Sequence, residues 1–176
     1  AIPRCFGSSS AIHRFFQLLV ELEFFQRIWN EYLIEYDEKI GINFSVQSMD
    51  AAITKAPLGG QSTGVSPVDR KKIGTKRSLL VDGNGIPLGC SVGSANQHDT
   101  QLVKATLASM PKNLHYPRMQ RMELDAGYDS QEVRVALFNH SYVPQIACNK
   151  RKSKITKKVN RYLPLTKERW KVERSH

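Results

Sequence analysis

Residues 75–95, TKRSLLVDGNGIPLGCSVGSA, carry the clearest structural signal in the sequence. Two apolar, β-prone segments flank residues 82–85, whose Asp, Asn and Gly side chains are typical of tight turns. The pattern predicts a β-hairpin. A sheet is therefore expected to organise the rest of the chain.

Toward the N-terminus, the chain changes from strand to loop to helix patterns. Residues 43–53 (NFSVQSMDAAI) alternate as a strand does, and residues 55–74 are rich in Gly, Pro, Ser and Thr, which predicts a long loop. Residues 11–40 repeat apolar side chains at three- and four-residue steps, which predicts helix with a break near residues 22–25. A serine at 8–10 is expected to cap this region, and Gly41 to end it.

Toward the C-terminus, strand and helix patterns alternate. The expected elements are a helix at 96–110, a strand at 118–125, a helix at 130–141 capped by Ser130, a strand at 142–149 and a helix at 164–176 with Thr166 as its cap. This order predicts an α/β fold with a central mixed sheet flanked by helices. We expect a helical N-terminal region at 1–42 and an α/β domain at 43–176.

The charge of the chain is concentrated at one end. The 176 residues include 26 Lys and Arg against 16 Asp and Glu, a net charge of +10, and residues 149–176 alone carry 11 basic and 2 acidic side chains. This favours a polyanionic partner such as DNA, although a solvated basic end has the same composition. No apolar run approaches the roughly 20 residues of a membrane span, and the start AIPRCFGSSS lacks the features of a secretory signal.

Three cysteines, Cys5, Cys90 and Cys148, lie far apart and form no CxxC pair. Their spacing argues against a disulfide scaffold and against a cysteine zinc site. A reducing interior, and hence a cytoplasmic location, is expected.

Three carboxylates are candidates for chemistry. Asp50 and Asp125 stand at the ends of two expected strands, and Glu173 lies on the last expected helix. Oxygen ligands suit Mg²⁺, and a pair of such ions activates water and stabilises a leaving 3′ oxygen. Each carboxylate alone also has an ordinary structural interpretation. Asp82 is expected in a turn, and Asp99 at a helix cap.

Three segments resemble, in order, the catalytic motifs of DDE-type transposases of bacterial insertion sequences. They are residues 47–99, beginning QSMDAAI and ending SANQHD, ELDAGYDS at 123–130, and RWKVERSH at 169–176. The likeness reaches back to CFGSSSAIHRFFQLLVE at 5–21, which is similar to the short helical region before that family's catalytic domain. The resemblance therefore covers most of the chain.

The resemblance implies a ribonuclease H-like fold and a DNA transposase activity. It places the metal-binding catalytic residues at Asp50, Asp125 and Glu173, and it implies two Mg²⁺ or Mn²⁺ ions. Cleavage at a transposon end would free a 3′-hydroxyl that attacks target DNA. The implied partners are transposon-end and target DNA and a second copy of the chain, with no membrane or small-molecule substrate, in the cytoplasm with the nucleoid.

Basic side chains near the motifs and in the tail are expected to contact DNA. Arg169 matches the Arg of the final motif and would hold a phosphate, or else pair with Glu173 four residues later. The full set is Arg70, Lys71, Lys72, Lys76, Arg77, Lys150, Arg151, Lys152, Arg169 and Arg174.

Two departures from the family pattern define an alternative. Thr166 stands where the family usually has Tyr, and the Lys that follows the family's Glu would lie beyond His176. The chain is therefore expected to be truncated just after Glu173. The alternative function is a weak or inactive transposase that binds DNA and competes with the full-length enzyme. The third alternative is an unrelated α/β nuclease or an RNA-binding domain. It is the least favoured of the three, because the sequence lacks the aromatic motif of an RNA recognition domain.

Overall fold

The computed structural model describes residues 3–67, 71–147 and 170–176. The chain divides into two compact units, Ala1–Gly41 and Ile42–His176. The first unit contains the short helix η1 (Arg4–Phe6) and the helices α1 (Ser9–Glu21) and α2 (Phe24–Lys39).

Local signals set the ends of these helices. Ser8 caps α1, because its hydroxyl accepts the backbone N–H of Ala11 at 3.2 Å. Glu23 has a left-handed backbone with a φ of 52°, which separates the two helices and confirms the expected break. Gly41, with a φ of 92°, follows the end of α2 as expected.

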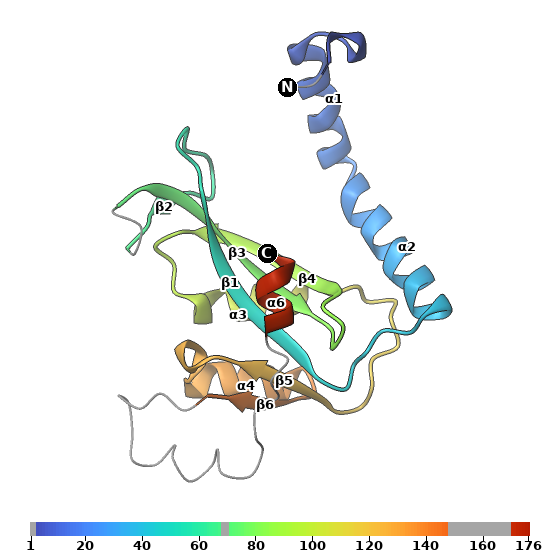
Figure 1. Ribbon diagram of the computed structural model, residues 1–176, viewed down its shortest axis with the longest axis vertical. Helices are drawn as coiled ribbons and strands as arrows, with labels where there is room; N and C mark the ends of the chain where they lie inside the picture. The colour runs from blue at the N-terminus through green and yellow to red at the C-terminus, as the bar shows by residue number, and fades with distance from the viewer. Residues whose placement is uncertain (1–2, 68–70, 148–169) are drawn as a thin grey trace. The chain divides into compact units, whose positions relative to one another are not determined.

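The second unit is built on one mixed sheet (Figure 1). Its strands are β1 (Gln47–Lys55), β2 (Gly64–Val65), β3 (Ile73–Val81), β4 (Pro87–Ser94), β5 (Gln120–Leu124) and β6 (Tyr142–Ile146). The order is β2-β3-β1-β5-β6, and β4 also pairs with β3. Strands β1, β3 and β4 pair antiparallel, whereas β1, β5 and β6 pair parallel. The mixed α/β sheet predicted from the sequence is confirmed.

The side chain of Asp82 stabilises the turn of the β3–β4 hairpin. Its Oδ1 accepts the backbone N–H groups of Asn84 and Ile86, both at 2.8 Å, and its Oδ2 accepts that of Asn43 at 2.9 Å. The carboxylate is buried and satisfies three backbone donors at once. Asp82 is thus a turn residue, as the sequence predicted.

Helices cover both faces of the sheet. Side chains alternate along β3, so Leu80 points to one face and Leu79 to the other. On the first face, α3 (Asp99–Ala108) packs against β3 and β4, and a Cβ on Gly89 would lie 2.8 Å from the carbonyl oxygen of Thr106. On the second face, α6 (Trp170–Ser175) lies over β1 and β3, and its Val172 is buried (Figure 1). The helix α4 (Gln131–Asn139) packs against β6.

Several expected boundaries differ from the observed ones. The first strand runs from Gln47 to Lys55, so it begins later than residue 43, and Asp50 lies inside it and not at its end as expected. The expected loop at 55–74 contains the short strand β2. The cap expected near His98–Asp99 is found at His98, whose Nδ1 accepts the backbone N–H of Thr100 at 3.3 Å. Thr166, the expected cap of the last helix, lies outside the described residues. None of the helices in the described ranges has the length and apolar character of a membrane span.

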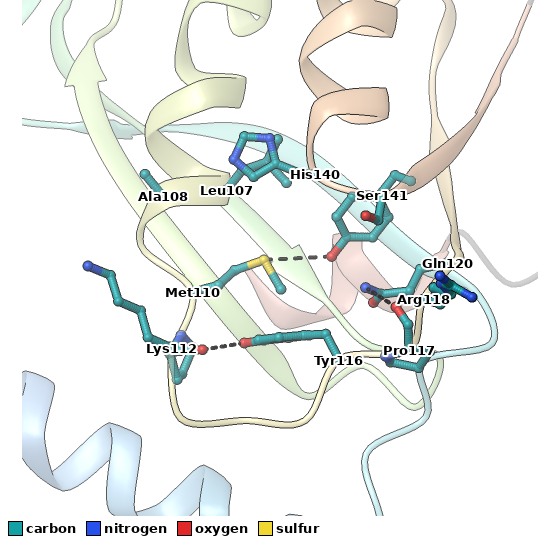
Figure 2. A pocket seen from close by; sticks show the side chains of 12 residues that line it. Leu107, Ala108, Met110, Lys112, Tyr116, Pro117, Arg118, Gln120, His140 and Ser141 are labelled. Atoms are coloured by element: carbon teal, nitrogen blue, oxygen red, sulfur yellow. Dashed lines mark hydrogen bonds between the residues drawn. The ribbon is translucent and has the colours of Figure 1, made fainter.

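A cavity of about 520 Å³ opens where β5 and β6 begin (Figure 2). It lies between the end of α3, the segment at 111–118 and the turn from α4 to β6. Its lining includes Gln120, the first residue of β5. The carboxylate at Asp125 lies past the other end of the same strand.

Candidate active site

Asp50 and Asp125 come together because β1 and β5 are neighbouring parallel strands. In their register Gln47 pairs with Met122. The paired residues end at Ser48 with Glu123, and continuing this register by two residues aligns Asp50 with Asp125, which lies just past the end of β5. Neighbouring strands lie about 4.8 Å apart, and residues at matching positions share a face. Both acids are half-buried.

The backbone after β5 orients Asp125. The short helix η2 (Ala126–Tyr128) follows at once, and the Oδ1 of Asp125 accepts the N–H of Gly127 at 2.7 Å. Tyr128 is completely buried and anchors the turn. One carboxylate oxygen is therefore held by the backbone.

The helix α6 covers the face of the sheet to which Asp50 belongs. Asp50 pairs with Leu79 across β1 and β3, and Leu79 forms a buried cluster with Val172 of α6. The Nζ of Lys171 donates to the carbonyl oxygen of Gly83 at 2.6 Å, so α6 is also tied to the hairpin turn. These contacts hold α6, the helix that carries Glu173, over the face of the sheet that includes Asp50.

Glu173 itself is not gathered with the two aspartates. Its side chain is exposed, because successive helix residues are about 100° apart and the adjacent Val172 occupies the position facing the sheet. In the part of the chain that the structure describes, no group of three or more His, Cys, Asp or Glu side chains is arranged to hold a metal ion. The register of β1 and β5 thus aligns two of the three predicted acids, and Glu173 stays a prediction.

The side chains of His176 and Arg77 lie on the same side of the sheet as Asp50. Arg77 stands two residues before Leu79 on β3, on the same face, and its Nη2 donates to the carbonyl oxygen of His176 at 2.8 Å. Burial lowers the pKa of the His176 imidazole, and the carboxylate of Asp50 acts in the opposite direction. Sequence reasoning missed the position of His176, and no local pattern signals it.

The other basic side chains expected at DNA are partly described. Lys71, Lys72 and Arg77 are exposed, the first two just before β3. Arg174 is exposed on α6 and lines, with Lys171, a cavity of about 250 Å³ beside the hairpin turn. Arg70, Lys150, Arg151, Lys152 and Arg169 lie outside the described residues.

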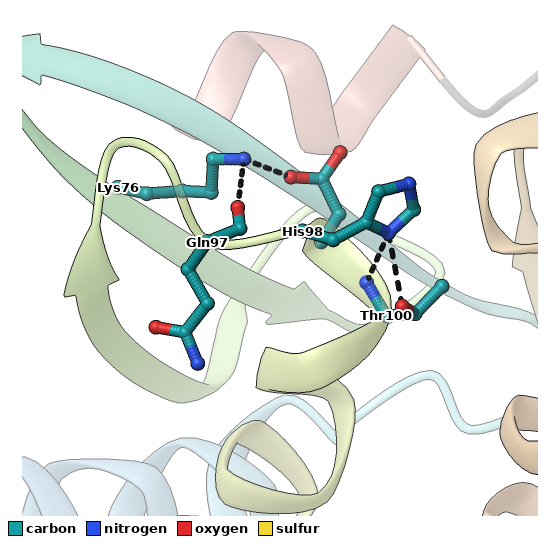
Figure 3. A network of polar contacts seen from close by, with 5 residues as sticks. Lys76, Gln97, His98 and Thr100 are labelled. Atoms are coloured by element: carbon teal, nitrogen blue, oxygen red, sulfur yellow. Dashed lines mark hydrogen bonds and ion pairs between the residues drawn. The ribbon is translucent and has the colours of Figure 1, made fainter. Parts of the chain in front are cut away.

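Lys76 has a different environment from the one expected. Its side chain is buried, and its Nζ lies 2.6 Å from Asp99 Oδ1 and donates to the carbonyl oxygen of Gln97 at 2.6 Å (Figure 3). The alternation of β3 turns Lys76 to the face covered by α3, away from the face of Asp50. We therefore correct the expected role: Lys76 ties the sheet to the start of α3 and is left out of the DNA-facing set.

Sequence reasoning also missed the cavity at the start of β5. A usable signal was present in residues 111–119, PKNLHYPRM, which combine prolines, an aromatic ring and basic side chains. The opposite side of the cavity is lined by His140 and Ser141 on the α4–β6 turn, which is remote in sequence. The cavity therefore forms only when these segments pack together.

The mixed sheet flanked by helices agrees with the fold class that the sequence predicted. The family model described as Transposase DDE domain matches residues 44–176. The chain therefore belongs to the DDE transposase family, which confirms the resemblance seen in the sequence.

Among curated proteins, the chain is similar to a putative transposase for insertion sequence element IS402 of Burkholderia cepacia. The two are 36% identical over 123 residues, which cover 67% of this chain and 54% of the relative. The chain thus spans about half the length of that relative.

The chain is also similar to two solved transposase structures. A piggyBac transposase synaptic complex with hairpin DNA has a TM-score of 0.40 and 17% identity, covering 69% of this chain and 27% of that one. The catalytic domain of Mos1 mariner transposase has a TM-score of 0.38 and 8% identity, covering 84% of this chain and 83% of that one.

Proposed function

We propose that this chain is the catalytic part of a DNA transposase that cleaves transposon ends and joins them to target DNA. Asp50, Asp125 and Glu173 are the proposed metal-binding catalytic residues. The observation that supports the proposal is the parallel register of β1 and β5, which, continued past Ser48 and Glu123, aligns Asp50 with Asp125 in a chain of the DDE family.

The donor set suits a hard divalent cation. Two half-buried carboxylates at adjacent strand positions repel each other unless a cation lies between them, and carboxylate oxygens are preferred ligands of Mg²⁺ and Mn²⁺. When bound, a pair of such ions activates water and stabilises a leaving 3′ oxygen. The Oδ1 of Asp125 is oriented by the backbone N–H of Gly127, and α6 carries Glu173, the proposed third ligand.

Basic side chains of this chain would hold the DNA. Arg77 lies on the face of Asp50, so it is placed to bind a phosphate beside the reacting one. Lys71, Lys72 and Arg174 are exposed and would extend this contact. Arg70, Lys150, Arg151, Lys152 and Arg169 complete the proposed set. Binding to transposon-end and target DNA, as a homodimer in the cytoplasm, belongs to the same proposal.

Metal-induced stabilisation tests the site directly. We expect Mg²⁺ or Mn²⁺ to raise the melting temperature of the full chain, since a ligand that binds only the folded state stabilises it. Asp50→Asn and Asp125→Asn should each abolish this shift and, because they relieve repulsion, should not lower the metal-free melting temperature. Glu132→Gln is the control, because Glu132 is an exposed carboxylate on α4 that pairs with Lys104.

Nicking of supercoiled plasmid carrying insertion-sequence ends tests the activity itself. Metal-dependent nicking that Glu173→Gln abolishes would support the three-carboxylate site. A metal shift that persists in both Asp variants would refute the assignment of Asp50 and Asp125.

A second candidate function is DNA binding without cleavage. The exposure of Glu173, and the lack of an assembled three-acid group within the described ranges, favour it. It predicts tight, salt-dependent DNA binding, with no nicking and no difference between the parent chain and Glu173→Gln.

A further inference from the structure

The cavity at the start of β5 and β6 is a separate site from the carboxylates. It has a volume of about 520 Å³, within the roughly 300–1,000 Å³ of pockets that bind small molecules. Gln120 lines it, whereas Asp125 lies five residues further along, about 16 Å for an extended strand. The proposed chemistry makes no use of this cavity.

An aromatic ring in a fixed orientation forms one wall. The hydroxyl of Tyr116 donates to the carbonyl oxygen of Pro111 at 2.6 Å, and Phe44 packs edge-on against the ring with centroids 5.4 Å apart. Figure 2 shows the ring nearly edge-on below Met110. Apolar side chains, including Leu107, line the cavity with it. A planar apolar group fits such a wall, because aromatic faces stack on flat π-systems.

The rim carries positive charge. Lys112 and Arg118 are exposed lining residues on opposite sides of the cavity in Figure 2. Among the lining residues that the structure describes, none is a carboxylate. The rim charge therefore favours an anion, and the guanidinium of an arginine is a group that proteins commonly use to bind phosphate.

The floor is polar but uncharged. The hydroxyl of Tyr142 donates to Gln47 Oε1 at 2.7 Å, and Gln47 Nε2 donates to Gln120 Oε1. Burial raises the pKa of Tyr142, so this phenol stays protonated at neutral pH. These polar groups are hydrogen-bonded to one another. Recognition of a ligand therefore depends on the Tyr116 ring and the cations at the rim.

We propose that this pocket binds a nucleotide, with the base against Tyr116 and the phosphate near Arg118, while Lys112 adds positive charge from the other side of the rim. The same chemistry has two sources, a free mononucleotide and a nucleotide within a single DNA strand. The proposal goes beyond the transposase activity and does not depend on the metal site.

Binding to the full chain is measured with four probes. They are thymidine 5′-monophosphate, a fluorescent ten-residue oligothymidylate, thymidine without phosphate, and deoxyribose 5-phosphate without base. We expect the two incomplete probes to bind at least about tenfold more weakly than the mononucleotide.

Variants separate the ring from the charge. Tyr116→Leu and Arg118→Gln should each weaken binding about tenfold, since each removes one of the two recognition elements. Tyr116→Phe keeps the ring and should stay within about twofold of the parent chain, which guards against a folding defect. Lys104→Gln is the matched charge control, because Lys104 is exposed on α3 and pairs with Glu132 outside the pocket.

The outcomes distinguish the sources. Mononucleotide binding with this variant pattern identifies a free nucleotide site, and binding of the oligothymidylate alone with the same pattern identifies a DNA-strand site. The proposal is overturned if neither probe binds, or if the affinities are the same in the parent chain, Tyr116→Leu and Arg118→Gln. Asp125→Asn should leave nucleotide binding unchanged. The proposed metal site and the proposed nucleotide pocket are therefore tested independently of each other.

Discussion

Replacing Lys76 with Met tests the buried ion pair between the sheet and α3. The side chain of Lys76 is 10% exposed and that of Asp99 is 34% exposed, and Lys76 Nζ lies 2.6 Å from Asp99 Oδ1. Removing one partner of a fully buried pair costs about 3–5 kcal/mol. Because Asp99 keeps a third of its exposure and rehydrates, we expect Lys76→Met to lower the free energy of unfolding by about 2 kcal/mol.

Replacing the other partner, Asp99, should lower the free energy of unfolding by more. Asp99→Asn leaves the less exposed member, Lys76, without its counter-charge, so its loss should reach about 3 kcal/mol. The double variant should lose at least about 1 kcal/mol less than the two single losses together, since the residues are in contact. The order of the two single effects follows from the two exposed fractions.

Urea unfolding followed by far-UV circular dichroism measures these losses, and fluorescence anisotropy measures DNA binding in parallel. Lys72→Met is the control, because Lys72 is an exposed lysine on the same segment, and it should change stability by less than about 0.5 kcal/mol. A Lys76→Met chain as stable as its parent, with several-fold weaker DNA binding, would refute the structural role of Lys76. That result would restore the DNA contact expected from the sequence.

Three further outcomes follow from packing and titration. Val172→Ala should cost about 1–2 kcal/mol by opening a cavity under α6, and hydrogen exchange should show faster opening of α6 than of β3. Asp82→Ala should cost about 3 kcal/mol in urea unfolding, since three backbone N–H groups lose their acceptor, whereas Asp82→Asn should cost less. Burial raises the pKa of Tyr142 above its unfolded value of about 10, so the stability it contributes is present below pH 10 and is lost as the pH rises further. Tyr142→Phe should therefore flatten the fall in stability above pH 10 by up to about 1.4 kcal/mol per pH unit, and an unchanged slope would contradict the burial of this phenol.

Local patterns were sufficient for most elements of the fold. The hairpin around residues 82–85, the caps at Ser8 and Ser130, and the break between α1 and α2 all depend on interactions within a few residues. Short-range hydrogen bonds and backbone preferences act before any tertiary contact forms, so they are visible in one sequence.

Lys76 shows where such patterns fail. Both faces of β3 carry apolar residues, Leu79 on one and Leu80 on the other, so alternation does not reveal an exposed face. The counter-charge at Asp99 is 23 residues away and meets Lys76 only when α3 packs on the sheet. A lysine beside expected DNA contacts was therefore assigned to DNA.

The sequence by itself determined that Asp125 stands just past a strand and that Glu173 belongs to a helix, whereas Asp50, expected at a strand end, lies inside β1. Only the tertiary structure decided that β1 and β5 are parallel neighbours whose register aligns the two acids. It also decided that Val172, and not Glu173, faces the sheet. Strand pairing and helix rotation depend on contacts between distant segments, and the free energy of burying an apolar side chain such as Val172 sets which way a helix turns.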